Sequence, residues 1–322
     1  MTATALGRSR PPAKLALGLA GASRPREGVA VVTVSSDAQI TDLAVNDHAC
    51  LTYGDPEELL DLTAAYIRDG LSGGLKVVWL SDSAPGLGVA ELARRGTAVE
   101  PALAAGQMTA MACENYLLSG QTFAAGHAMS WLNEQLSVCL DQGFPGLRLA
   151  LDMSWALRPI VGVEQLPDFE EAVGTVLSDA AAASVLCQYD RERFDPVTLA
   201  SVAGRHSRSV AAATYYADAM LRICRQYAPP GVRLAGEIDY QAEEPLSLAL
   251  AEALRLSGDI TMNMADLSFI DVPCMRMIVN LARSLPATRK AILQCQPGVA
   301  DRFAAFGATD VSSISLVAVD DR

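Results

Sequence analysis

Apolar residues recur along this chain in two spacings. Short runs that are almost continuously apolar predict strands buried on both faces of a sheet, and longer stretches with apolar positions three or four residues apart predict amphipathic helices. Strands are predicted at 49–53, 76–81, 107–113, 147–152 and 184–189. Helices are predicted between them at 56–72, 88–95, 123–142, 166–181 and 196–206. This alternation predicts an α/β domain over residues 29–206, with a mostly parallel sheet covered on both faces.

A second, smaller α/β pattern occupies the last third of the chain. Strands are predicted at 232–237, 259–264, 290–294 and 313–317, and helices at 245–256, 273–285 and 299–306. Residues 207–227, rich in Ala and Tyr, predict a helix that Pro229, Pro230 and Gly231 stop. We therefore expect a linker helix and a Pro-Pro-Gly hinge over residues 207–230, followed by a second domain over residues 231–322.

The charge pattern narrows the class of partner. The 322-residue chain has a net charge of −12, and its excess of acid lies mainly in residues 28–227, whereas residues 1–27 carry five bases and one acid. We expect residues 1–28 to be a disordered basic tail. An acidic body repels phosphate backbones, so no nucleic acid is expected as a partner. No apolar run reaches the roughly 18 to 20 residues that span a bilayer, so no membrane association is expected.

The cysteines and histidines lack the spacings of known metal and catalytic motifs. The seven cysteines include no CxxC pair and an odd number cannot pair completely, so neither disulfides nor a metal site is predicted and the chain is expected in the cytoplasm. The three histidines, at 48, 127 and 206, accompany no nucleophile motif. Residues 70–77 have the wrong spacing for a P-loop and fit a helix end followed by a strand. No cofactor and no enzymatic activity are therefore expected.

Polar and aromatic residues gather at the predicted carboxyl ends of strands in the first domain. In open parallel sheets these ends form the crevice that binds ligands. The residues predicted to line it are His48, Tyr53, Asp152, Trp155, Tyr189, Asp190 and Arg191. Each also fits an ordinary structural role: the large aromatic residues fit core packing, Asp190 with Arg191 fits a surface turn, and His48 fits a buried hydrogen-bonding position. His206, with two nearby arginines, fits either an anion site or the dipole of a helix end.

Two motifs make residues 231–319 resemble a STAS domain. Residues 236–239 (GEID) follow the first strand of this unit and residues 265–271 (ADLSFID) follow the second, with Gly307 and Ala308 after the last helix. The resemblance implies a surface that binds a protein, in many members a kinase-like anti-sigma factor. The residues expected on that surface are Asp239, Ser268, Asp271, Val272, Pro273, Cys274 and Met275. STAS domains begin with an additional strand that is not predicted here, so we expect a sheet one strand short, with its edge covered by the linker helix or by a second chain in a homodimer.

The loop after Asp271 departs from the STAS pattern. Many relatives carry there a serine or threonine whose phosphorylation adds charge and breaks docking, whereas this sequence has Val, Pro, Cys and Met at 272–275. Release by phosphorylation in this loop is therefore not expected. Asp271 fits a helix N-cap and also a partner contact, and Asp239 fits a turn. Cys274, in the first helical turn, fits either a redox-active thiol of lowered pKa or a small residue that fills space.

Four short motifs make residues 45–210 similar to MEDS (DcmR-type sensory) domains. They are residues 47–53 (DHACLTY), 69–71 (DGL), 152–155 (DMSW) and 187–190 (CQYD). The resemblance implies a reduced RecA-like fold that receives a signal, for example a small molecule, and passes it to an attached output domain.

Together the two resemblances imply a signalling regulator in which a sensory domain controls a STAS domain, which binds an anti-sigma factor and so changes transcription. Two alternatives stay open. One is a non-catalytic scaffold that binds other STAS proteins, and the other is a small-molecule or redox sensor that uses the crevice or Cys274.

Overall fold

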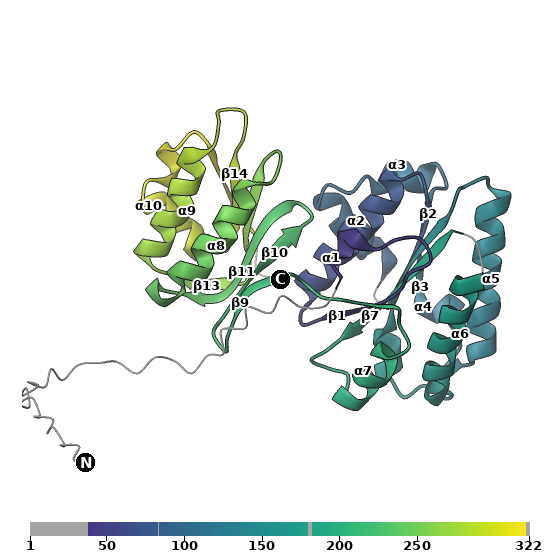
Figure 1. The fold of residues 1–322 in the computed structure, drawn as a ribbon. Helices are drawn as coiled ribbons and strands as arrows, with labels where there is room; N and C mark the ends of the chain where they lie inside the picture. Colours follow the sequence, from purple (N-terminus) through teal and green to yellow (C-terminus); the bar gives the residue numbers. More distant parts are fainter. Residues whose placement is uncertain (1–37, 83, 180–181, 320–322) are drawn as a thin grey trace, which may run out of the picture.

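The computed structural model describes residues 38–82, 84–179 and 182–319, which form two α/β units, each built on its own large sheet (Figure 1). The predicted basic tail, residues 1–28, lies outside the described residues. Within the described ranges, every helix is too short or too polar to cross a bilayer.

The first unit is organised around six parallel strands. Their order across the sheet is β3-β2-β6-β7-β1-β8. The strands are β1 (His48–Tyr53), β2 (Lys76–Ser81), β3 (Met108–Ala112), β6 (Leu147–Asp152), β7 (Ala183–Asp190) and β8 (Arg208–Val210). A small hairpin of β4 (Leu118–Ser119) and β5 (Thr122–Phe123) lies outside this sheet. The predicted α/β domain with a parallel sheet is confirmed.

Helices cover both faces of this sheet because successive residues of a strand point to opposite faces. In β2, Val77 and Trp79 join one core and Val78 and Leu80 join the other. The first core packs against α1 (Pro56–Ser72), α2 (Pro85–Arg94) and α3 (Val99–Ala104), and the second against α5 (Ala125–Asp141), α6 (Leu166–Asp179) and α7 (Pro196–Ala203) (Figure 1). The shorter elements are α4 (Cys113–Tyr116), η1 (Ile40–Asp42), η2 (Met153–Leu157) and η3 (Val163–Gln165).

The second unit has a mixed sheet with helices packed on one face (Figure 1). The strand order is β15-β14-β12-β11-β10-β9, and β13 also pairs with β11. The strands are β9 (Thr214–Ala217), β10 (Leu221–Tyr227), β11 (Pro230–Ile238), β12 (Ile260–Met264), β13 (Leu267–Ile270), β14 (Ala291–Cys295) and β15 (Ile314–Ala318). The pairs β9·β10 and β10·β11 are antiparallel and the others are parallel. The helices are α8 (Glu243–Leu254), α9 (Val272–Ser284), α10 (Pro297–Ala305), η4 (Tyr240–Ala242) and η5 (Ala308–Asp310).

The helix predicted over residues 207–227 is wrong. This segment forms β8, which extends the first sheet beside β1, and then β9 and β10 of the second sheet. In β10, Leu221 and Ile223 pack in the core of the second unit, whereas Cys224 and Tyr227 pack in a core of the first. A strand buries residues on two faces in this way, and this packing outweighs the helix propensity of the alanines.

The predicted domain boundary and the short sheet are also corrected. The second sheet includes β9 and β10, so the second unit begins before residue 231. Pro229, Pro230 and Gly231 turn the β10–β11 hairpin and begin β11, and they do not form a hinge after a helix. Because β10 and β12 flank β11, the position of the strand expected to be missing is filled.

Candidate functional site

The carboxylates at the carboxyl ends of the parallel strands are used to cap turns. Tyr53, Asp152 and Asp190 are the last residues of β1, β6 and β7. Asp152 accepts hydrogen bonds from the backbone amides of Ser154 at 3.0 Å and Asp82 at 3.1 Å, and Asp190 caps the turn after β7. The Tyr53 hydroxyl lies 3.1 Å from the Ser154 hydroxyl. These predicted crevice residues therefore have partners within the chain.

Three other predicted crevice residues lie in the core or in an ion pair. Trp155 is fully buried, with its ring 4.6 Å from that of Phe123. Tyr189 is also fully buried, and its hydroxyl donates a hydrogen bond to Glu170. Arg191 lies 3.1 Å from Glu58 of α1. The first two thus pack as core residues, and Arg191 belongs to a charged cluster described below.

His48 is the first residue of β1, so its predicted position at a carboxyl end is wrong. Its Nε2 lies 3.0 Å from Oε2 of Glu170, and Nε2 of His206 lies 3.3 Å from the same oxygen. The two imidazole rings are 3.9 Å apart. The Cys187 sulfur lies 3.4 Å from Glu170 Oε2 and 3.6 Å from His48 Nε2. The structure thus brings together His48, Glu170, Cys187 and His206, called the His-Glu-Cys cluster below.

Burial sets the protonation of this cluster. Burial opposes ionisation of Glu170, but hydrogen bonds and charge from His206 and His48 hold the pKa of its carboxyl well below the usual range. Burial lowers the pKa of His48 despite its hydrogen bond to Glu170. Burial and the nearby Glu170 charge raise the pKa of the Cys187 thiol far above its usual value. Near neutral pH the cluster therefore contains an ionised carboxylate, a neutral His48 and a protonated thiol.

Sequence reasoning missed Glu170 and Cys187 as partners of the two histidines. The four side chains come from β1, α6, β7 and the segment after α7, so no local spacing marks them. One signal was available: Glu170 lies between Phe169 and Val173 on the buried face of α6. A charged residue on an apolar helix face needs a buried partner.

The first unit matches a known family. Residues 47–207, half of the chain, match the family described as MEDS, MEthanogen/methylotroph, DcmR Sensory domain. The chain belongs to the MEDS family. The transcriptional repressor DcmR of Methylorubrum extorquens (strain DSM 6343 / CIP 106787 / DM4) is 27% identical over 155 residues, which are 48% of this chain and 55% of DcmR. The chain thus spans about half the length of this curated relative.

Solved structures of other proteins show weak similarity. A KaiC-like protein of Pyrococcus horikoshii OT3 has a TM-score of 0.42 and 10% identity, and the match covers 57% of this chain and 79% of that one. The flagellar accessory protein FlaH of Methanocaldococcus jannaschii has a TM-score of 0.40 and 10% identity, covering 60% and 90%. An uncharacterized P. horikoshii protein in complex with an unknown peptide has a TM-score of 0.45 and 14% identity, covering 60% and 94%. No conclusion about ligands or activity follows from similarity this low.

Acidic residues at the start of α1 join the MEDS domain to the second sheet. Glu58, whose side chain is 1% exposed, accepts two hydrogen bonds from Arg222 of β10, at 2.7 and 2.9 Å, and also pairs with Arg191. Asp55 lies 2.9 Å from Arg233 of β11. Burial opposes ionisation of Glu58, but hydrogen bonds and charge from Arg222 keep its pKa below the usual value. Buried ion pairs therefore tie the MEDS domain to the face of the second sheet that lies opposite its helices.

Asp61 anchors the same interface through the backbone. It is buried, and its carboxyl group accepts hydrogen bonds from the amides of Tyr227 at 3.0 Å and Ala228 at 2.6 Å, at the end of β10. Arg68 donates to the Tyr227 carbonyl at 2.8 Å. Burial raises the pKa of Asp61 to about 7, against the effect of the two amides. The interface thus contains a carboxyl group that titrates near neutral pH.

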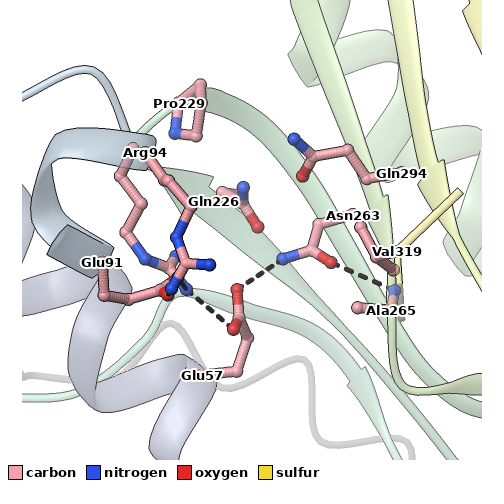
Figure 2. Close-up of a pocket in the computed structure, with 10 residues that line it drawn as sticks. Glu57, Glu91, Arg94, Gln226, Pro229, Asn263, Ala265, Gln294 and Val319 are labelled. Carbon is pink, nitrogen blue, oxygen red and sulfur yellow. Dashed lines mark hydrogen bonds and ion pairs between the residues drawn. The ribbon is translucent and has the colours of Figure 1, made fainter. Parts of the chain in front are cut away.

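A polar cavity of about 360 Å³ lies between the two units (Figure 2). Glu57 of α1 accepts a hydrogen bond from Asn263 of β12 at 2.7 Å and pairs with Arg95 at 2.7 Å, so this wall of the cavity joins the units. Gln226 and Gln294 also line it (Figure 2). The side-chain amide group of Gln226 is buried, and neither its nitrogen nor its oxygen has a hydrogen-bond partner among the described residues.

Two carboxylates predicted on the partner surface of the second unit are caps. Asp271 is the N-cap of α9 and accepts from the Cys274 amide at 2.9 Å, which confirms the predicted cap. Asp239 accepts from the Gln241 amide at 3.0 Å and caps η4, which confirms the predicted turn. Cys274 is fully buried, and burial together with Asp271 raises the pKa of its thiol. The redox-active alternative for Cys274, which requires a lowered pKa, is therefore not supported, and the alternative of a small residue that fills space fits the structure.

The other predicted surface residues are divided between core and solvent. Met275 is buried and Pro273 is half-buried, whereas Ser268 and Val272 are exposed. Ser268 lies within β13, and its hydroxyl donates to the Gly236 carbonyl. Three large apolar side chains are exposed at the carboxyl ends of β11 and β13, namely Tyr240 (62%), Phe269 (38%) and Val272 (48%). Sequence reasoning missed the first two.

Proposed function

We propose that this protein is a cytoplasmic signalling regulator in which the MEDS domain controls the second unit. The second unit is, in this proposal, a STAS domain that binds a kinase-like anti-sigma factor. Membership of the MEDS sensory family supports a regulatory role, and the relative DcmR is a transcriptional repressor. The all-parallel sheet supports the reduced RecA-like fold that the resemblance implies.

The observation that carries the proposed output is the apolar group of Tyr240, Phe269 and Val272. Exposed large apolar side chains that gather at one place on a soluble protein mark interaction surfaces. Tyr240 and Val272 each lie two residues after the paired strand residues Ile238 and Ile270, near the cap at Asp271, where the STAS resemblance implies a partner. The ring of Phe269 is partly covered by Arg302 of α10. The chain is acidic overall, and an acidic protein repels phosphate backbones, so a nucleic acid is not favoured as the partner at this surface.

Strand β11 supports coupling between the MEDS domain and this surface. Arg233 in β11 pairs with Asp55, the N-cap of α1. At the end of the same strand, the Ile238 carbonyl accepts from the Asp271 amide at 3.2 Å. A shift of α1 is therefore passed along one strand to the start of α9. A signal changes partner binding only if it stabilises one packing of this interface more than another.

Control by the MEDS domain takes the place of phosphorylation in this proposal. Residues 272–275 contain no hydroxyl group, so the first turn of α9 offers no site for a kinase. We also propose that the protein is not an enzyme. Asp152 and Asp190 at the strand ends already accept backbone hydrogen bonds, and residues 70–77 lack P-loop spacing.

Capture of partners from a lysate of the host tests the proposed output. The bait is the full chain, compared with Val272→Arg and with the control Val197→Arg, which alters an exposed residue of α7 in the MEDS domain. All three are checked for folding by circular dichroism. We expect mass spectrometry to identify a kinase-like anti-sigma factor with the wild type and the control, and its loss with Val272→Arg. Recovery of no such factor by folded wild type contradicts the proposal.

A scaffold that binds other STAS proteins is the second candidate. The absence of a hydroxyl group at 272–275 favours it, since binding to a kinase-like partner is commonly released by phosphorylation of this loop. The same capture separates the two candidates. Recovery of STAS proteins, and not an anti-sigma factor, through the Val272 surface supports the scaffold.

A further inference from the structure

We propose that His48, Glu170, Cys187 and His206 form a binding site for one divalent transition-metal ion, with Zn²⁺ as the best-fitting member. One donor atom from each residue lies within 4.8 Å of the other three. Imidazole, thiolate and carboxylate are the donors that Zn²⁺ takes in proteins. This site goes beyond the proposed function and does not depend on it.

The spacing of the donors fits a tetrahedral shell. Bonds of about 2.0–2.3 Å from Zn²⁺ to nitrogen, oxygen and sulfur place neighbouring donors roughly 3.2–3.8 Å apart. Four of the donor pairs in the cluster are separated by 3.0, 3.3, 3.4 and 3.6 Å. An ion among them therefore requires only small shifts of the side chains.

His206 directs an unsatisfied nitrogen into the cluster. Its Nδ1 lies 2.7 Å from the carbonyl oxygen of Val202, which can only accept, so Nδ1 carries the hydrogen. In the neutral ring Nε2 is then an acceptor, and it faces the acceptor Oε2 of Glu170 at 3.3 Å in a side chain that is 0% exposed. Apart from this contact with Glu170, the nitrogen has no hydrogen-bond partner among the described residues. A metal ion satisfies both acceptors, and the Val202 carbonyl is the kind of outer partner that orients a metal-binding histidine.

The charges of the donors balance a divalent ion. The Glu170 carboxylate and the Cys187 thiolate supply two negative charges, and the two imidazoles bind in their neutral form, so the filled site is neutral in the buried core. On binding, the Cys187 thiol gives its proton to solvent. The Tyr189 hydroxyl donates to Oε1 of Glu170, which leaves Oε2 for the ion. The competing account is a network that hydrogen bonds hold together without an ion.

A surface depression gives an ion a route to the cluster. His48 and His206 line this depression together with Gly204, Arg205 and Ser207. Both imidazoles are almost fully covered, so an ion enters from this side only when the segment that follows α7 moves, but without separation of the strands.

Titration of the metal-free full chain with Co²⁺ tests the proposal. Ligand-field absorption of Co²⁺ reports tetrahedral coordination, and a thiolate charge-transfer band reports bound cysteine. We expect one ion per chain, displaced by Zn²⁺, and loss of the charge-transfer band in Cys187→Ser. His206→Ala is expected to weaken binding at least about tenfold. The control His127→Ala, which alters an exposed histidine of α5, is expected to bind as wild type does.

X-ray absorption of the Zn²⁺-loaded wild type keeps the test decisive if a cluster variant fails to fold. We expect one sulfur and three nitrogen or oxygen neighbours around the ion. A wild type that binds no Co²⁺, or a metal shell without sulfur, overturns the proposal in favour of the hydrogen-bonded network. Neither result involves a partner protein, so failure of the metal site is distinct from failure of the proposed function.

Discussion

Replacement of Arg222 by methionine removes a buried ion pair between the MEDS domain and the second unit. Loss of one partner from a buried pair costs about 3–5 kcal/mol, because the other charge stays buried. Here Glu58 keeps Arg191 at 3.1 Å and the Gly54 amide at 2.8 Å, and the Arg222 side chain is 21% exposed. We therefore expect Arg222→Met to lower the free energy of unfolding by about 2–3 kcal/mol, at or below the lower end of that range.

Urea unfolding of a double-mutant cycle measures this contribution. The cycle comprises wild type, Arg222→Met, Glu58→Gln and the double variant, and we expect a coupling energy of about 1–3 kcal/mol. Arg255→Met is the matched control, since its pair with Glu252 is at the surface and the arginine is 77% exposed. The control is expected within about 0.5 kcal/mol of wild type. A coupling energy near zero refutes the view that this pair holds the units together.

Three further predictions concern single groups. Because burial raises the pKa of Asp61 from 3.8 to about 7, its stabilisation is complete below pH 3.8 and is lost as the pH rises from there through about 7. Urea unfolding at about pH 4 and about pH 8 should show the loss in wild type, and an equal loss in Asp61→Asn contradicts it. Asp271→Ala removes the cap of α9 and should lower stability by about 1 kcal/mol, and an unchanged melting temperature argues against this role. Cys274 is buried and the pKa of its thiol is raised. Treatment of the folded protein with a thiol-alkylating reagent, followed by mass spectrometry, should therefore find Cys274 unmodified. Alkylation of the folded protein as fast as that of the urea-unfolded protein would contradict the buried position.

Local signals in the sequence were sufficient to predict the helices and strands whose first and last residues are marked by caps, prolines, glycines or the ends of an apolar run. Helix α1 has the predicted bounds because Asp55 caps it, Pro56 begins it and Gly73 follows it. Strands β2 and β6 also have the predicted bounds, since every residue in each is buried and the apolar run marks its length. The bounds of these elements could therefore be predicted from the local sequence, although β2 and β6 pair with strands that are distant in the chain.

Elements and sites that depend on distant contacts were not predictable in the same way. Strand β10 (LRICRQY) is defined by burial of its two faces against different units, and the alanines and tyrosines that precede it favoured a helix over the whole of residues 207–227. Glu58 lies in the first turn of a helix, where acidic residues are common for reasons of the helix dipole, so nothing local marks it as an interface residue. His48 and Glu170 meet only because α6 packs beside β1.

Binding of the full chain to a kinase-like anti-sigma factor tests the central claim most directly. The measurement is calorimetric titration with each purified kinase-like anti-sigma factor of the host, using wild type, Val272→Arg and the control Val197→Arg. The account predicts one-to-one binding to one of these factors, weakened at least about tenfold by Val272→Arg and unchanged by Val197→Arg. Folded wild type that binds none of them, or Val272→Arg that binds as tightly as wild type, contradicts the account.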